Sequence, residues 1–136
     1  MSYLLDTNVI SELRKGPRAS PAVLRWFAAV ADEDLRLSVV VVGELRQGVE
    51  RVRRRDPTSA RRLDTWIKKL VADFEERILV VDQATAELWG KLNVPDPLPA
   101  IDGLLAATAL IHELALVTRN GRDVARTGVR LVNPFA

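Results

Sequence analysis

Four acidic residues stand at points of the chain where carboxylates commonly do chemistry. Asp6 follows the apolar run at 3–5, and Glu44 lies in the otherwise apolar run Val-Val-Gly-Glu-Leu. Asp102 comes just after a proline-rich loop, and Asp123 follows the apolar pair at 116–117. Ligands in parallel α/β sheets bind outside the carboxyl ends of the strands. We therefore expect these four acids to border one crevice.

Four crowded carboxylates would repel one another by several kcal/mol at a low effective dielectric. A divalent cation would neutralise that repulsion, and an oxygen-only ligand set favours Mg²⁺ or Mn²⁺ over zinc. Such ions serve phosphodiester hydrolysis by activating a water and by stabilising charge in the in-line transition state. The four acids together thus predict metal-dependent hydrolysis.

Each acid also has an ordinary structural role. Asp6 is well suited to cap the helix that follows it, and for Asp6 alone this is the commoner role. Glu44 could be a partly solvated helix residue, and Asp102 could serve only the electrostatics of a helix start. Asp123 could cap a turn. Beside Glu44, Gly43 is expected to let another backbone come close.

Several other kinds of chemistry are excluded or disfavoured. The chain has no cysteine, so it has no thiol nucleophile, disulfide or zinc–thiolate site. His112 is the only histidine, which leaves no metalloprotease pair, and we expect it to be structural or exposed. The sequence contains neither a P-loop nor GxGxxG, so no organic cofactor is expected. Asn8 replaces the second acid that a haloacid-dehalogenase-type phosphatase requires.

Short apolar runs alternate with helical patterns, which is typical of an α/β fold with a parallel sheet. The strands are expected at 3–5, 35–38, 78–81, 116–117 and 129–132, the third of them buried on both faces. The helices are expected at 8–14, 21–31 with Ser20 as the cap, 40–54, 59–75, 83–92 and 101–113, with a short helical turn after Asn120. A turn is expected at 56–58, and the prolines in 93–99 exclude a helix there.

The length of 136 residues fits a single domain over 1–136. The net charge is +2, and sixteen of the twenty basic residues are arginine. So many arginines suit phosphate contacts, but a GC-rich genome explains them equally well. No signal peptide is recognisable and no apolar run reaches the ~20 residues of a membrane span, so we expect a cytoplasmic protein without membrane contact. The arginine-rich stretch 46–62 could contact RNA or an acidic protein segment, although a solvated helix face is the commoner explanation.

The segment Leu4–Ser11 resembles the opening of PIN domains, and specifically of the VapC toxins of bacterial toxin–antitoxin pairs. The resemblance continues in order through Val41–Leu45, Ile101–Ala106, Leu116–Asn120 with Asp123, Gly128–Arg130 and Asn133–Phe135. It therefore covers nearly the whole chain. One position departs from the family pattern, because Val124 stands where members often have Phe.

The resemblance implies a three-layer α/β/α sandwich around a parallel sheet of about five strands. It implies a Mg²⁺- or Mn²⁺-dependent endoribonuclease toxin that cleaves RNA with an activated water. The family pattern places metal-binding and catalytic roles on Asp6, Glu44, Asp102 and Asp123. Supporting polar roles fall on Thr7, Asn8, Thr118 and Asn120, and either Asp123 or Asn120 completes the ligand set.

The family also implies partners: an RNA substrate, a VapB-type antitoxin and a second copy of the chain in a homodimer. Promoter DNA would be contacted only through the antitoxin. The alternative function is a non-catalytic module that binds nucleic acid or protein on the same fold. A third possibility is a metal-dependent phosphatase acting on small phosphoesters.

Overall fold

A parallel five-stranded sheet forms the centre of the computed structural model, which describes all residues from Met1 to Ala136. Its strands are β1 (Tyr3–Leu5), β2 (Leu35–Ser38), β3 (Ile78–Leu79), β4 (Ala115–Val117) and β5 (Leu131–Val132), in the spatial order β3-β2-β1-β4-β5. Tyr3 pairs with Leu35 on one side and with Ala115 on the other. The first strand is therefore the central one, as its apolar composition requires.

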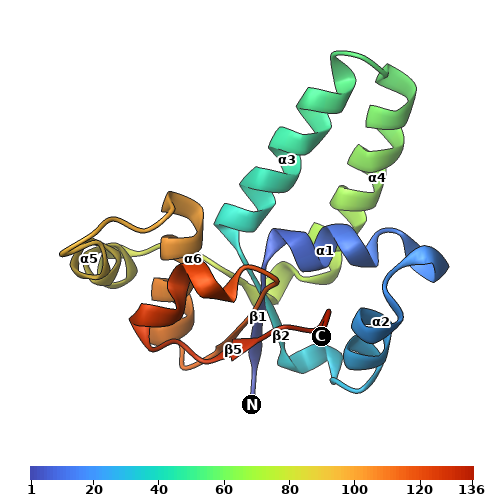
Figure 1. Cartoon of the computed structure of the whole chain (residues 1–136). Helices are drawn as coiled ribbons and strands as arrows, with labels where there is room; N and C mark the ends of the chain where they lie inside the picture. Colours follow the sequence, from blue (N-terminus) through green and yellow to red (C-terminus); the bar gives the residue numbers. More distant parts are fainter.

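Helices cover both sides of this sheet, which confirms the predicted α/β/α sandwich (Figure 1). They are α1 (Thr7–Leu13), α2 (Pro21–Ala28), α3 (Val39–Arg53), α4 (Pro57–Asp73), α5 (Gln83–Leu92) and α6 (Ala100–Ile111). Short 3₁₀ segments are η1 (Gly16–Arg18), η2 (Asp32–Asp34), η3 (Glu75–Arg77) and η4 (Gly121–Thr127). None of the helices combines the length and the apolar character needed to cross a membrane.

The core lies between the central strands and the helices that pack on them. Leu4, Leu5 and Val117 have no exposed surface, because strands of a parallel sheet are covered on both faces. Ala106 and Ala109 of α6 are also fully buried. Their small side chains allow α6 to pack closely on the sheet behind its first turn.

The chain changes direction at β1. It runs from β1 outward to β2 and β3, and then crosses back to place β4 and β5 on the other side of β1. Because all the strands are parallel, the residues that follow β1, β2 and β4 meet at one edge of the sheet. Asp6 and Thr118 directly follow β1 and β4, and Ser38 is the last residue of β2, so these three residues lie at the carboxyl end of the sheet.

Three predicted elements are clearly shorter in the structure: the second helix, the third strand and the fifth strand, which covers Leu131–Val132 and not 129–132. The second helix ends at Ala28 and not near Ala31, and Ser20 occupies its cap position without a side-chain capping hydrogen bond. The third strand is limited to Ile78–Leu79, both only half-buried, and Val80 is 61% exposed. This strand lies at the edge of the sheet and pairs with β2 alone, so the prediction of burial on both faces is wrong.

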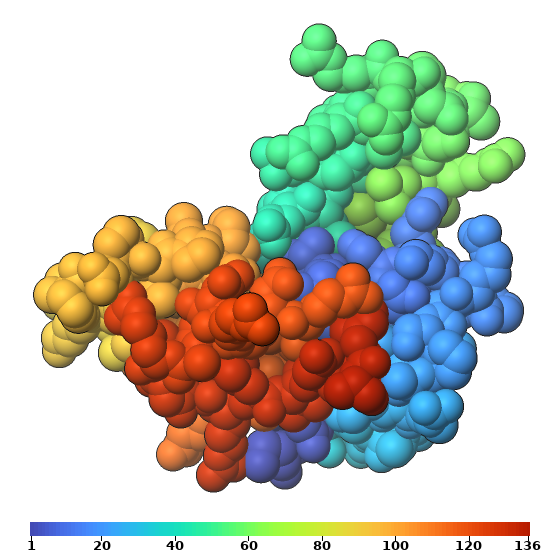
Figure 2. Space-filling view, in the orientation of Figure 1, coloured from blue at the N-terminus to red at the C-terminus, as the bar shows by residue number.

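The predicted turn at 56–58 is instead the start of α4. Asp56 caps this helix by accepting a hydrogen bond from Ser59 N at 3.1 Å, and Pro57 takes the first helical position, where its missing N–H costs nothing. Helices α3 and α4 consequently form a tight hairpin. The hairpin projects from the body of the molecule, and residues near position 55 form its tip (Figures 1 and 2).

Candidate active site

Asp6 lies at the carboxyl end of the central strand and is 5% exposed. Its backbone N–H donates to Val117 O at 2.9 Å, which continues the ladder between β1 and β4 by one residue. Its side chain caps α1, since Oδ1 accepts a hydrogen bond from Thr7 N at 2.7 Å. The helix-cap role is therefore compatible with a place at the carboxyl end of the sheet for this one carboxylate.

A polar network fixes the second oxygen of Asp6. Oδ2 accepts hydrogen bonds from Thr118 Oγ1 at 2.7 Å and from Asn8 Nδ2 at 3.3 Å. The side-chain oxygen Oδ1 of Asn8 in turn accepts from Arg119 N at 3.2 Å, and Thr118 Oγ1 accepts from Asn120 N at 3.0 Å. These bonds tie the loop after β4 to the loop after β1 and leave the Asp6 carboxylate little freedom to rotate.

Glu44 reaches the same edge of the sheet from α3. That helix is positioned by buried Ser38 at the end of β2, whose Oγ accepts a hydrogen bond from Val40 N at 3.0 Å. Glu44 Oε1 accepts a hydrogen bond from Thr7 Oγ1 at 2.5 Å. Because Thr7 directly follows Asp6, this bond holds the second acid beside the first. Sequence reasoning missed Ser38, although a serine between a strand and a helix is a recognisable cap signal.

Asp102 lies in the first turn of α6 and makes no hydrogen bond through its side chain. Burial and, after it, the nearby charges of Asp6, Asp123 and Glu44 together raise the pKa of its carboxyl group to about 6. All three other predicted acids thus act on Asp102 electrostatically. The structure brings the four carboxylates into one neighbourhood, with Asp102 as the member whose charge lacks a partner.

Asp123 and Asn120 belong to the exposed rim of this neighbourhood. Asp123 lies in η4, where its backbone N–H donates to Asn120 O at 3.1 Å. Neither side chain is held by a hydrogen bond within the protein. Neither side chain is therefore fixed in place, and the charge of Asp123 already acts on Asp102.

The donors present fit a hard divalent cation. As the side chains stand, no three Asp, Glu or His groups converge closely enough to hold one ion. Mg²⁺ does not require such convergence, because it usually keeps several waters and uses one or two carboxylates. The unpartnered Asp102 beside the rigid Asp6 supplies two carboxylates, and a cation there would remove the repulsion that raises the pKa of Asp102.

Gly103 sets the position of Asp102 in a way that the sequence analysis did not recognise. A Cβ at Gly103 would lie 3.2 Å from Leu98 Cβ and 3.2 Å from Trp89 Nε1, so α6 begins in close contact with α5 and the proline-rich loop. In the sequence, a glycine directly after Asp102 was the signal that could have predicted this close contact. The prediction for Gly43 is wrong, because nothing lies within 4 Å of a Cβ placed there. His112 is exposed at the end of α6, away from the acids.

Thr118 offers a test of how this network positions Asp6. Replacing Thr118 by Val keeps the side-chain shape but removes the hydroxyl that donates to Asp6 and accepts from Asn120 N. We expect Mn²⁺ affinity to fall about 10-fold to 100-fold, the usual range for a group that orients a metal ligand. Titration calorimetry would measure the change, and Thr118→Ser should restore most of the affinity. Equal affinity in Thr118→Val and the unchanged protein would remove Thr118 from this role.

Comparison with known proteins places this arrangement in a family. The family model described as "PIN domain" matches residues 3–129. The toxin FitB of Neisseria gonorrhoeae is 33% identical over 139 residues, with 97% of each chain covered. The VapC ribonuclease Y4jK of Sinorhizobium fredii is 33% identical over 139 residues, covering 97% of this chain and 96% of the relative.

A solved structure supports the same grouping. The structure of FitAB bound to an IR36 DNA fragment contains a chain that superposes with a TM-score of 0.88 at 29% identity. The superposition covers 98% of this chain and 96% of that chain. The likeness therefore extends over the whole sheet and over every element that carries one of the four acids.

Proposed function

This chain belongs to the PIN domain family, and we propose that it is a metal-dependent endoribonuclease acting as the toxin of a VapBC-type toxin–antitoxin pair. We further propose that residues 1–136 act as one domain. The single observation that carries the catalytic part is the neighbourhood of Asp6, Glu44, Asp102 and Asp123, in which Asp102 lacks a compensating partner. The relatives named toxin and ribonuclease support the biological part.

The proposed roles follow from how firmly each residue is held. Asp6 and Asp102 are the main metal ligands, because Asp6 is fixed by three hydrogen bonds and Asp102 has both oxygens free. Glu44 is held through Thr7 and can accept a proton or a water hydrogen bond with its second oxygen. Asp123 or Asn120 completes the set from the rim. Asn8 and Thr118 keep the Asp6 carboxylate in place.

Bound Mg²⁺ or Mn²⁺ would supply an activated water and would stabilise negative charge on the phosphate in the in-line transition state. The protein residues do the positioning. Four carboxylates would otherwise repel an approaching RNA phosphate, so the cation also makes the crevice accessible to an anionic substrate. Four neighbouring acids without a neutralising ion would be a poor site for a simple RNA-binding module.

The partners are proposed on the same basis. The solved structure named FitAB bound to DNA supports a protein partner that contacts DNA, and we propose a VapB-type antitoxin in that role. Contact with promoter DNA would then occur only through the antitoxin. A homodimer is proposed from the family alone.

Incubation of the purified protein with structured RNAs tests the proposal. We expect cleavage with Mg²⁺ or Mn²⁺ and none with EDTA, with products detected on denaturing gels. RNA that stays intact under all metal conditions, while still being bound, would favour the non-catalytic binding module. Turnover of small phosphoesters without RNA cleavage would favour a phosphatase.

A further inference from the structure

The tip of the α3–α4 hairpin carries a dense group of exposed arginines. We define the hairpin tip as the exposed residues Arg51, Arg54, Arg55, Arg61 and Arg62. Asp56 is the only acid among residues 51–62. The tip stands clear of the sheet and the other helices, so its side chains face solvent from several directions (Figure 2).

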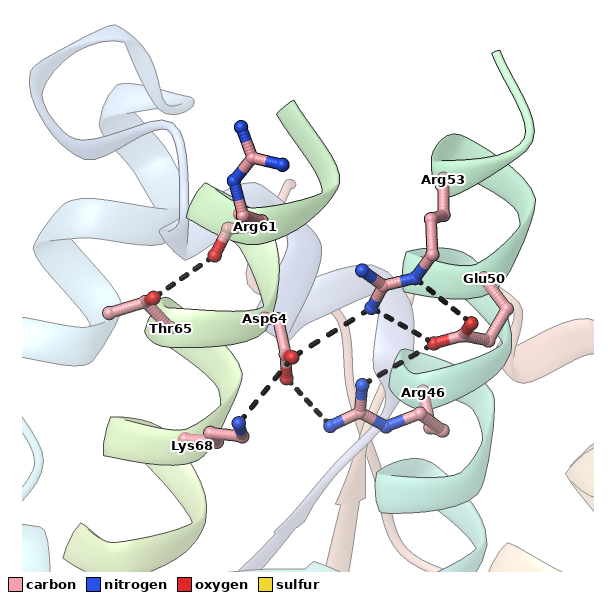
Figure 3. A network of polar contacts seen from close by, with 7 residues as sticks. All are labelled: Arg46, Glu50, Arg53, Arg61, Asp64, Thr65 and Lys68. Carbon is pink, nitrogen blue, oxygen red and sulfur yellow. Dashed lines mark hydrogen bonds and ion pairs between the residues drawn. The ribbon is translucent and has the colours of Figure 1, made fainter. Parts of the chain in front are cut away.

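The neighbouring basic residues are already occupied. Asp64 of α4 binds Arg46 Nη2 at 2.8 Å, Arg53 Nη2 at 3.8 Å and Lys68 Nζ at 3.5 Å, and Glu50 binds Arg46 and Arg53 from α3 (Figure 3). Arg46, together with Lys68, holds the pKa of Asp64 below its ordinary range. Arg53 and Arg46 do the same to the pKa of Glu50. This network links the two helices and fixes the orientation of the hairpin.

The tip arginines lie outside that network. None of the five forms an ion pair, and Figure 3 shows the Arg61 guanidinium pointing away from Asp64. Arg61 makes only a long hydrogen bond, 3.4 Å, to Thr58 Oγ1. If every arginine of the hairpin had an acidic partner, the hairpin would be an ordinary solvated surface. Glu50 and Asp64 instead pair with Arg46, Arg53 and Lys68, and the tip arginines keep their positive charge unpaired.

We propose that the hairpin tip binds the phosphate backbone of the RNA substrate and so holds it for the carboxylate site. This inference rests on the proposed ribonuclease function. Arginine binds phosphate bidentately, and five free arginines on a rigid support suit a polyanion whose bases are not read. The four acids at the crevice repel RNA, so attraction must come from elsewhere on the surface.

A protein partner fits this surface less well. Stable protein interfaces have an apolar, often aromatic centre surrounded by a polar rim. The exposed large apolar residues are Met1, Val39, Val80, Val94, Ile111 and Leu131, and none belongs to the tip. A surface with charge and no apolar centre is typical of phosphate contacts.

The same helix carries both ends of the proposed substrate path. Glu44 and Arg54 are ten positions apart along α3 and its C-cap, which corresponds to about 15 Å at 1.5 Å per residue. At ~3.4 Å per stacked nucleotide, that span covers roughly four to five nucleotides. An RNA longer than about five nucleotides can therefore contact the tip and the carboxylate site at the same time.

The test measures RNA binding without cleavage. We compare the double variant R54A/R55A with the control R25A/K91A, which also removes two exposed positive charges without an ion pair, from α2 and α5. Fluorescence anisotropy in EDTA with a labelled 20-nucleotide RNA gives the Kd at several salt concentrations. We expect R54A/R55A to weaken binding about tenfold at 0.1 M salt and to reduce the salt slope by about 1.4.

The control variant should change the Kd less than twofold at 0.1 M salt, as expected for charges outside the contact. Equal losses in the two variants, or no loss in R54A/R55A, would overturn the proposal. Unchanged RNA binding together with weaker binding of the copurified antitoxin would assign the tip to a protein partner instead. Because no cleavage is needed, failure of the ribonuclease function would show separately, as RNA that is bound but left intact with Mg²⁺.

Discussion

Replacing Asp6 by Asn should reduce metal-dependent RNA cleavage by about 1000-fold, the upper end of the loss when one electrostatic group is removed from an active site. The substitution removes the charge of the most rigid carboxylate in the crevice. It keeps an oxygen that can accept from Thr7 N, so α1 should retain its cap. Initial cleavage rates with Mn²⁺ and a fluorescent RNA would measure the effect.

A matched control tests whether losing any acidic charge, and not only the charge of Asp6, reduces cleavage. Asp73 is an exposed acid at the end of α4 whose side chain has no ion pair, and Asp73→Asn should cleave RNA at the unchanged rate. Circular dichroism melting would verify that Asp6→Asn is folded. A folded Asp6→Asn variant with more than a tenth of the original rate would remove Asp6 from the proposed chemistry.

Replacing Asp102 by Asn should stabilise the metal-free protein above pH 6. The pKa of Asp102 is about 6 in the folded chain, against ~3.9 in an unfolded one. Between these values the folded protein keeps a proton that the unfolded chain releases, so this group lowers stability as the pH rises, and the full penalty applies above pH 6. Asn carries no such penalty, and we expect Tm to be about 3 °C higher at pH 8 in EDTA.

Two comparisons make this prediction specific. At pH 4 the Tm values of Asp102→Asn and the unchanged protein should converge, because Asp102 is then mostly protonated in the folded chain. With Mn²⁺ at one hundred times its Kd, the unchanged protein should gain about 2.7 kcal/mol of stability while Asp102→Asn gains little. A lower Tm for metal-free Asp102→Asn at pH 8 would contradict the proposed repulsion among the acids.

The sheet and most helices could be predicted because their signals are local. Apolar runs such as Tyr3–Leu5 need only their own residues to be recognised, and the period of Val42, Leu45 and Val49 identifies α3. The wrong predictions concern segments whose structure depends on the elements packed around them. Ile78–Leu79 reads as a buried strand in isolation, but its place at the sheet edge leaves Val80 exposed. Asp56 and Pro57 read as a turn, although the same two residue types start a helix equally well.

The four acids could be identified individually from the sequence, but how their side chains contact one another could not be predicted. Thr118 and Asp6 are 112 residues apart, and their 2.7 Å hydrogen bond depends on the register between β1 and β4. The raised pKa of Asp102 depends on burial and on three distant charges, which no local pattern reveals. The free arginines of the hairpin tip became distinguishable only when the partners of Arg46 and Arg53 were known.

The most direct test of the central claim is Mn²⁺ binding, measured by electron paramagnetic resonance of the free ion during titration. We predict saturable binding by the unchanged protein, and affinity at least about tenfold weaker in both Asp6→Asn and Asp102→Asn. The Asp73→Asn control should bind Mn²⁺ like the unchanged protein. Absence of binding by the unchanged protein, or equal affinity in all four proteins, would contradict a metal site formed by Asp6 and Asp102.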